Sequence, residues 1–241
     1  MALSQNQIRK NFLNSIDTAF RIYGPAREWC IWNYESINEN PYQPLIAAKV
    51  VSLSFLSVVA AWDEFVEESF LRYLCGTNAP SGLSPKLRIG RCKNLTHAQQ
   101  ALSGSVNIQE GTRQLRWSDY TWVIKVASIF FEKGKPYSSV TDRFKERLKD
   151  AQIIRNRVAH NSLKSKKQFK KIANKFLKND LDSSLQKGFS PGLLLASQRP
   201  ENIFNSEWLE GNDQSYWGDI FEAYMSMYVD LVELIVPDSK N

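Results

Sequence analysis

The sequence predicts an all-α fold, arranged as a single-domain helical bundle of about six or seven helices. Apolar residues recur every three or four positions along several segments, which is the spacing of one helix face. Helix-capping residues precede these segments, and Gly or Pro follows most of them. No segment alternates apolar and polar residues over a useful strand length. At 241 residues the chain is long enough for one sizeable core, so we expect one domain over residues 1–241.

The expected helices follow one another along the chain. They cover 4–23, 45–74, a short stretch around 97–102, a segment beginning at 118 or 119, the stretch 139–162, the lysine run 164–178, and 215–236. Ser4 caps the first helix, and Gly24-Pro25 ends it. We place the core of the domain at 45–178, and we expect the helix at 215–236 to pack against it.

Residues 45–74 form the longest apolar segment. The composition of LIAAKVVSLSFLSVVAAW is close to that of a membrane span, but Lys49 and serines interrupt it and acidic residues follow at once. We therefore expect a central buried helix and no membrane partner. Its later apolar stripe consists of Val59, Trp62, Val66, Phe70 and Tyr73. Asp63 lies at the edge of that stripe, whereas Glu64 and Glu68 are expected to face solvent.

The remaining stretches are expected to be irregular. A long insertion at 76–117 contains Gly, Pro and Ser throughout, together with several basic residues. A second irregular connection is expected at 180–212. The connector after the first helix contains Trp29 and Trp32, which we interpret as plugs at the edge of the core, with stacking on nucleic-acid bases as the alternative.

Charge and cysteine content limit the function classes. The formal net charge is +6, which permits a polyanionic partner. Three scattered cysteines and the absence of an apolar stretch near the N-terminus favour a reducing, cytoplasmic location. Cys92 and His97 belong to no complete set of metal ligands, and no Gly-rich nucleotide loop is present, so we expect neither a metal nor a cofactor.

The stretch 139–162 contains the residues that we interpret as functional. Ser139 and Asp142 form a capping box, and an apolar stripe follows at Val140, Phe144, Leu148, Ala151, Ile154 and Val158. Arg155 falls inside that stripe, so its cation requires a carboxylate partner, a cleft or an anionic ligand. Asn156 is one turn before His160 and could orient the imidazole. In the simpler interpretation, Arg155 and Arg157 only complement the C-terminal end of the helix dipole.

The run Arg155-Asn156-Arg157-Val158-Ala159-His160 resembles the Rx4–6H signature of the HEPN superfamily, including the polar residue after the first Arg. The helix at 50–74, with its Trp-Asp-Glu-Phe-Val run, is similar to the aromatic and acidic helix of that family. The resemblance covers roughly 45–178. It is nearest to the ribonuclease-like HEPN proteins of prokaryotic defence and toxin systems, and it implies a dimer that pools two such motifs without a metal ion.

RNA cleavage also fits the chemistry of these residues. The substrate supplies its own nucleophile, the 2′-OH, and needs a general base, a general acid and stabilisation of charge at phosphorus. A histidine serves as either acid or base near neutral pH, and an arginine donates to two phosphate oxygens at once. We therefore predict Arg155, Asn156 and His160 as the catalytic residues. Because each chain offers a single motif histidine, we expect a homodimer with a shared site.

Supporting residues are predicted on two other segments. Asp63 is expected to hold Arg155, with Glu67 as the alternative. The lysine run forms an amphipathic helix whose basic face is expected to follow an RNA backbone, unless that face is merely solvated. The residues that we expect to bind RNA are Lys164, Lys166, Lys167, Lys170 and Lys171.

Two other functions are compatible with the same residues. The helical domain could bind RNA, a nucleotide or a protein without cleaving, or it could be a scaffold in which Arg155 is half of a buried ion pair. The expected partners are RNA and a second copy of the chain, and the resemblance leaves room for an antitoxin or another regulatory protein.

Overall fold

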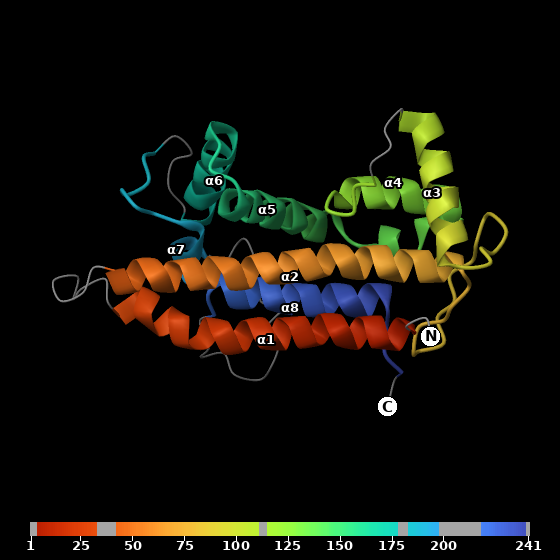
Figure 1. Cartoon of the computed structure of the whole chain (residues 1–241), viewed down its shortest axis with the longest axis horizontal. Helices are drawn as coiled ribbons and strands as arrows, with labels where there is room; N and C mark the ends of the chain where they lie inside the picture. The colour runs from red at the N-terminus through yellow and green to blue at the C-terminus, as the bar shows by residue number, and fades with distance from the viewer. Residues whose placement is uncertain (1–3, 33–41, 111–114, 178–182, 198–217, 240–241) are drawn as a thin grey trace. The chain divides into compact units, whose positions relative to one another are not determined.

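The protein is all-α in a computed structural model that describes residues 4–32, 42–110, 115–177, 183–197 and 218–239. Eight α-helices lie in these ranges, seven of them at least seven residues long, and the described residues contain no strand (Figure 1). They are α1 (Gln5–Trp32), α2 (Tyr42–Leu74), α3 (Leu95–Glu110), α4 (Tyr120–Phe130), α5 (Asp142–Ala159), α6 (Leu163–Phe176), α7 (Pro191–Leu195) and α8 (Ile220–Ile235). Two short 3₁₀ turns, η1 (Glu132–Gly134) and η2 (Tyr137–Ser139), separate α4 from α5.

The chain divides into two compact units, each assembled from separate segments. Unit 1 consists of Met1–Leu13, Ala61–Lys149 and Val229–Asn241, and unit 2 consists of Asn14–Ala60 and Asp150–Tyr228. Helices α1, α2, α5 and α8 contribute residues to both units. The expectation of a single domain stays a prediction.

Aromatic side chains form the core of unit 1 around Phe70 of α2. The ring centroid of Phe70 lies 5.4 Å from that of Trp117 and 4.9 Å from those of Phe131 and Tyr137. Helix α4 begins at the residue that the sequence predicts, because the Asp119 side chain accepts from the backbone N–H of Thr121 at 3.1 Å and of Trp122 at 3.2 Å. The expected stripe of α2, including Phe70, is buried.

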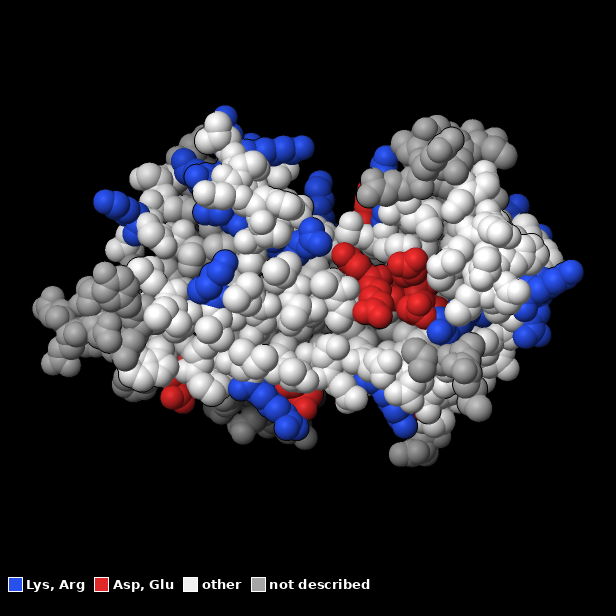
Figure 2. Space-filling view, in the orientation of Figure 1, with Lys and Arg blue, Asp and Glu red and all other residues white. Residues whose placement is uncertain are grey.

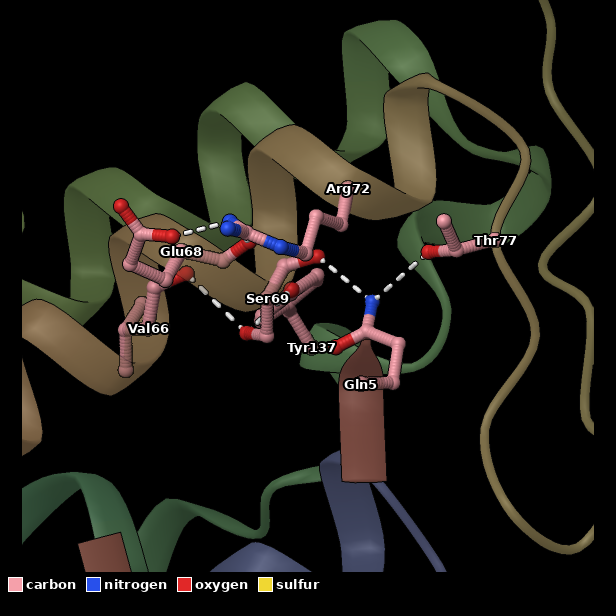
Figure 3. Close-up of polar contacts among 7 residues, drawn as sticks. All are labelled: Gln5, Val66, Glu68, Ser69, Arg72, Thr77 and Tyr137. Atoms are coloured by element: carbon pink, nitrogen blue, oxygen red, sulfur yellow. Dashed lines mark hydrogen bonds and ion pairs between the residues drawn. The ribbon is translucent and has the colours of Figure 1, made fainter. Parts of the chain in front are cut away.

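A buried polar network ties α1, α2 and η2 together within unit 1 (Figure 3). Gln5 Nε2 donates to the backbone oxygen of Ser69 at 3.0 Å and to Thr77 Oγ1 at 3.3 Å. The Ser69 hydroxyl lies 2.9 Å from the hydroxyl of Tyr137. Buried polar groups are costly without partners, so these bonds fix how the start of α1 packs on α2.

In unit 2, a second network joins α1 to the start of α8. The ring of Tyr23 stacks on Phe221 at 3.9 Å, and its hydroxyl donates to the Asp219 carboxylate. Arg27 Nε donates to the same carboxylate at 2.6 Å, and the backbone N–H of Glu222 donates to it at 2.9 Å. Burial raises the pKa of Asp219, although Tyr23, Glu222 and Arg27 all oppose the shift.

The end of the first helix was predicted wrongly. Ser4 caps α1 as expected, since its hydroxyl accepts from Gln7 N at 3.2 Å, but the helix continues through Pro25 to Trp32. Pro25 is exposed, so the missing backbone donor is on the solvent side, while Tyr23 and Cys30 keep the buried face continuous. Packing therefore overrides the Gly-Pro stop signal.

The predicted boundaries also fail in the segments on either side of α4. Helix α3 covers 16 residues, whereas only a short helix was expected inside the insertion. Ser139 lies in η2 and does not cap α5. Asp142 is instead in the first turn of α5, where Lys145 Nζ lies 2.9 Å from it and lowers its pKa.

Part of the connection expected at 180–212 is also helical. The short helix α7 lies there, and its N-cap Ser190 accepts from Leu193 N at 3.4 Å. Helix α8 agrees with the closing helix predicted at 215–236, and the apolar residues predicted for it from Phe221 to Ile235 are buried. Trp217 and the rest of 198–217 lie outside the described residues.

Helix α2 meets the length and composition criteria for a membrane span over Pro44–Leu74, and it is the one described helix that does so. Half of its most apolar window is buried within the protein. The central helix of a protein core meets the same criteria.

Gly192 of α7 packs directly on the backbone of α2 in unit 2. A Cβ at this position would lie 1.8 Å from the carbonyl oxygen of Ala48. We expect Gly192→Ala to lower the free energy of unfolding by about 2–3 kcal/mol or more, because backbone must move to admit the methyl group. Urea denaturation measures the change.

The matched control for this substitution is Gly104→Ala in α3. A Cβ at Gly104 meets nothing within 4 Å, so this variant should raise the free energy of unfolding by about 0.5–1 kcal/mol. Equal stability of the two variants would contradict the close approach of α7 to α2.

Candidate functional site

Arg155 lies at the border of the buried face of α5. Ala151 and Ile154 are fully buried, Arg155 is half-buried, and His160 after the helix is exposed. Arg155 Nη1 donates to Asn156 Oδ1 at 3.1 Å. Its Nε is buried and has no hydrogen-bond partner among the described residues. One edge of the guanidinium is thus held by Asn156, and an unsatisfied donor remains.

His160 is held by its backbone at the junction of α5 and α6. Its N–H donates to the carbonyl oxygen of Asn156 at 2.9 Å, and its own carbonyl accepts from Ser165 Oγ at 2.9 Å. Arg157 Nη1 lies 3.5 Å from the same carbonyl. Within the described part of the chain, the imidazole makes no hydrogen bond, and the amide of Asn156 accepts from Arg155. The side chain of His160 is therefore open to solvent on a fixed backbone.

Helix α6 is amphipathic, as its sequence predicts. Ser162 caps it by accepting from Ser165 N at 3.1 Å, and Phe169, Ile172 and Phe176 are buried. Four of the predicted RNA-binding lysines are exposed: Lys164, Lys166, Lys167 and Lys171. Lys170 is half-buried.

Basic residues dominate the part of unit 2 that contains α6 and the end of α5. Residues 151–179 include nine Lys or Arg and no Asp or Glu. Figure 2 shows several of these side chains over α6 and the adjoining end of α5. The preceding acid, Asp150, is buried and lies 3.6 Å from Lys175. This segment offers a phosphate-bearing ligand many cations and no competing carboxylate.

The two predicted supporting acids lie in unit 1. Asp63 is half-buried at the edge of the α2 stripe, as expected. Burial raises the pKa of Glu67, an effect that the Trp117 indole opposes and the carboxylates of Glu68 and Glu64 reinforce. Arg155 lies in unit 2, so contact of Asp63 or Glu67 with it stays a prediction.

Glu68 differs from its predicted role on the solvent face. It is half-buried and forms an ion pair with Arg72, whose side chain is only 5% exposed (Figure 3). The two residues are one helical turn apart, which lets the carboxylate neutralise a cation at the border of the core.

The burial of Arg147 was not predicted from the sequence, and the exposure of Trp29 differs from its prediction. Arg147 of α5 is buried, and its Nη2 lies 2.8 Å from Glu146 Oε1. Like Arg155, it follows the apolar spacing of its helix, since it lies three residues after Phe144. Trp29 is 46% exposed on α1, so it does not plug the core. The side chain of Trp32 lies outside the described residues.

Metal ligands do not gather in the described ranges, where no three His, Cys, Asp or Glu side chains are grouped to hold an ion.

Comparisons of the chain with protein-family models, curated proteins and solved structures find no match.

The bond from Ser165 to His160 suggests a direct test of how the junction is fixed. Ser165→Ala removes a buried hydroxyl that donates to the carbonyl of His160, and we expect a loss of about 1–2 kcal/mol in the free energy of unfolding. The amide hydrogen of His160 should also exchange faster with solvent. Gln168→Ala, on the exposed face of α6, is the control and should change stability by less than about 0.5 kcal/mol. Unchanged exchange at His160 would show that Ser165 does not fix this junction.

Proposed function

We propose that this protein is a metal-independent endoribonuclease of the HEPN type, acting as a homodimer that shares Arg155 and His160 of two subunits in one site. The observation that carries the proposal is the exposed imidazole of His160 on a backbone held from both α5 and α6, next to an acid-free basic segment. A base that must meet a large polyanion needs an exposed ring, fixed backbone and cationic surroundings.

Arg155 supports the proposal through its unsatisfied Nε. A buried donor without a partner costs about 1–3 kcal/mol, and a phosphate oxygen would satisfy it. Asn156 holds the other edge of the guanidinium, which limits the directions in which Arg155 can donate. The role of Arg155 in the proposed reaction is to neutralise the charge that develops on the phosphate oxygens.

The proposed reaction uses the 2′-OH of the substrate as nucleophile. His160 of one subunit accepts the 2′-OH proton as the oxygen attacks phosphorus, and the bond from phosphorus to the 5′-oxygen breaks. The partner subunit's His160 donates a proton to that leaving oxygen. The products are a 2′,3′-cyclic phosphate and a 5′-OH end. The biological setting that we propose is prokaryotic defence or a toxin system in the cytoplasm, with an antitoxin or another regulator as a further partner.

Incubation of the purified protein with RNA in EDTA tests the proposed chemistry. We expect cleavage without added metal, fragments ending in a 2′,3′-cyclic phosphate or its hydrolysed monophosphate, and no cleavage of an all-DNA substrate. His160→Ala should lower the rate by about 10²-fold or more, because it removes a general acid or base. End-group analysis and single-turnover rates measure these outcomes.

Mixing two inactive variants tests the shared site. If His160→Ala chains and Arg155→Ala chains exchange subunits, the mixed dimer contains one His160 and one Arg155. Its activity should exceed that of either variant alone but stay below the wild-type rate, because one of the two proton transfers lacks its histidine. A monomer that is fully active at micromolar concentration would exclude the shared site. Activity that requires Mg²⁺, or that survives His160→Ala, would overturn the mechanism. RNA binding without cleavage would assign the chain to the non-catalytic binding class.

The exposed lysines of α6 are proposed to bind the RNA backbone. Replacing Lys164, Lys166, Lys167 and Lys171 with Gln should weaken RNA binding, because fewer phosphates are neutralised. The log–log salt slope should fall by roughly 0.7–0.9 for each phosphate that no longer pairs with a lysine. Binding measured between low and physiological salt gives that slope.

The control for this variant removes the same charge from unit 1. Lys10, Lys93, Lys133 and Lys135 are exposed there, and their replacement with Gln should change the slope less. Equal effects of the two quadruple variants would mean that only net charge matters and that the α6 face has no special role.

A further inference from the structure

Cys75 and Cys92 meet at the C-terminal end of α2 in unit 1. Cys75 follows the last residue of α2, and Cys92 lies in the loop that leads to α3. The backbone N–H of Cys92 donates to the carbonyl oxygen of Leu74 at 2.9 Å, and Arg91 Nε donates to the carbonyl of Cys75. Two consecutive residues of the loop are therefore bonded to two consecutive residues at the helix end.

These bonds bring the two cysteines within disulfide reach. Peptide geometry places the Cα of Cys75 roughly 3 Å from the oxygen of Leu74, and the Cα of Cys92 lies roughly 4 Å from that same oxygen through its own N–H bond. The two Cα atoms are thus at most roughly 7 Å apart, the upper limit for a disulfide. Gly76, with φ of 73°, lets the chain turn here with the Arg91 side chain packed against it.

The thiols also interact electrostatically. Burial raises the pKa of Cys75, the neighbouring Cys92 thiolate adds to that shift, and the cations of Arg91 and Arg72 oppose it. Both cysteines are free in the structure, with Cys92 buried and Cys75 half-buried. Cys75 is therefore the thiol that a soluble oxidant reaches first.

We propose that Cys75 and Cys92 form a redox-sensitive pair that closes to an intramolecular disulfide when the protein meets a disulfide oxidant such as oxidised glutathione. The Cys75 thiolate attacks one glutathione sulfur, forms a mixed disulfide and releases one glutathione thiolate. The Cys92 thiolate then attacks the Cys75 sulfur and releases the second. The two protons of the cysteine thiols end on the two reduced glutathiones, so the exchange balances.

Closure would tie the loop 76–91 to the end of α2 and fix the start of α3. The loop contains Lys86, Arg88 and Arg91. The disulfide would therefore restrict the positions that these three cations can take. Cross-linking a loop of this length restricts the unfolded chain, and the apparent melting temperature should rise by roughly 5–10 °C. Dithiothreitol should reverse the rise.

The experiment uses the full-length protein, treated with oxidised glutathione at neutral pH, alkylated and digested with trypsin. We expect a peptide in which Tyr73–Lys86 is linked to Cys92–Lys93, and the loss of two free thiols. The control is Cys30→Ser: Cys30 lies on α1, and burial raises its pKa to about 11. This variant should form the same linked peptide at the same rate.

The single variants Cys75→Ser and Cys92→Ser make the proposal falsifiable. Neither should form the linked peptide or gain melting temperature, and Cys92→Ser should stop at a mixed disulfide between Cys75 and glutathione. Stable glutathione adducts on the wild type without the linked peptide would overturn the proposal. So would a link that involves Cys30, or one that forms only after urea unfolds the chain.

Discussion

The burial of α2 is the constraint on which the rest of the structure depends. Each large apolar side chain buried there contributes about 1.5–3 kcal/mol relative to exposure, and α2 carries such residues on several sides. In unit 1 the rings of Trp117, Phe131 and Tyr137 cover Phe70, and in unit 2 Phe221 and Tyr224 lie against Phe55. The cost of leaving this helix uncovered explains why the other helices are amphipathic. It also explains why the acids of α2 lie at the edge of its buried surface or outside it, and why its buried cation, Arg72, is paired with Glu68.

The proposed site lies where that constraint ends. Ile154 is still fully buried, but one residue later the side chain of Arg155 is only half-buried, and His160 is free of packing. The chain holds the backbone of His160 with the carbonyl of Asn156 and the hydroxyl of Ser165, so order at this point does not require burial of the ring. A fixed backbone with an exposed functional group is the arrangement that recognition of a large ligand needs.

Local signals allowed the helices themselves to be predicted, because periodicity and capping act over a few residues. The spans of α2, α4 and α6 follow from their apolar spacing, from Asp119 and from the lysine pattern. The continuation of α1 through Pro25 has a local signal in the helical spacing of the buried Tyr23, Ala26 and Cys30, but the Gly24-Pro25 stop signal outweighed it in the prediction. The bonds Gln5–Ser69 and Tyr23–Asp219 join residues 64 and 196 positions apart, and the closeness of Cys75 to Cys92 depends on how a loop folds back. Long-range partners decide these features, so reasoning from sequence alone missed them.

The assignment of residues to the candidate site stays a prediction, and the geometry around Arg155 could not be predicted from the sequence. A helical wheel places Arg155 on an apolar stripe, and this led to the expectation that a carboxylate would pair with it. The structure gives Arg155 a neutral partner, Asn156, and leaves its buried Nε without an acceptor among the described residues. An unsatisfied buried donor costs about 1–3 kcal/mol, and no hydrogen bond to the described residues offsets this cost. Water, an ion or a ligand can satisfy a donor of this kind. Residues 151–179 carry eight cations besides Arg155 and no acid, so the acceptor that we propose for its Nε is the oxygen of a bound phosphate.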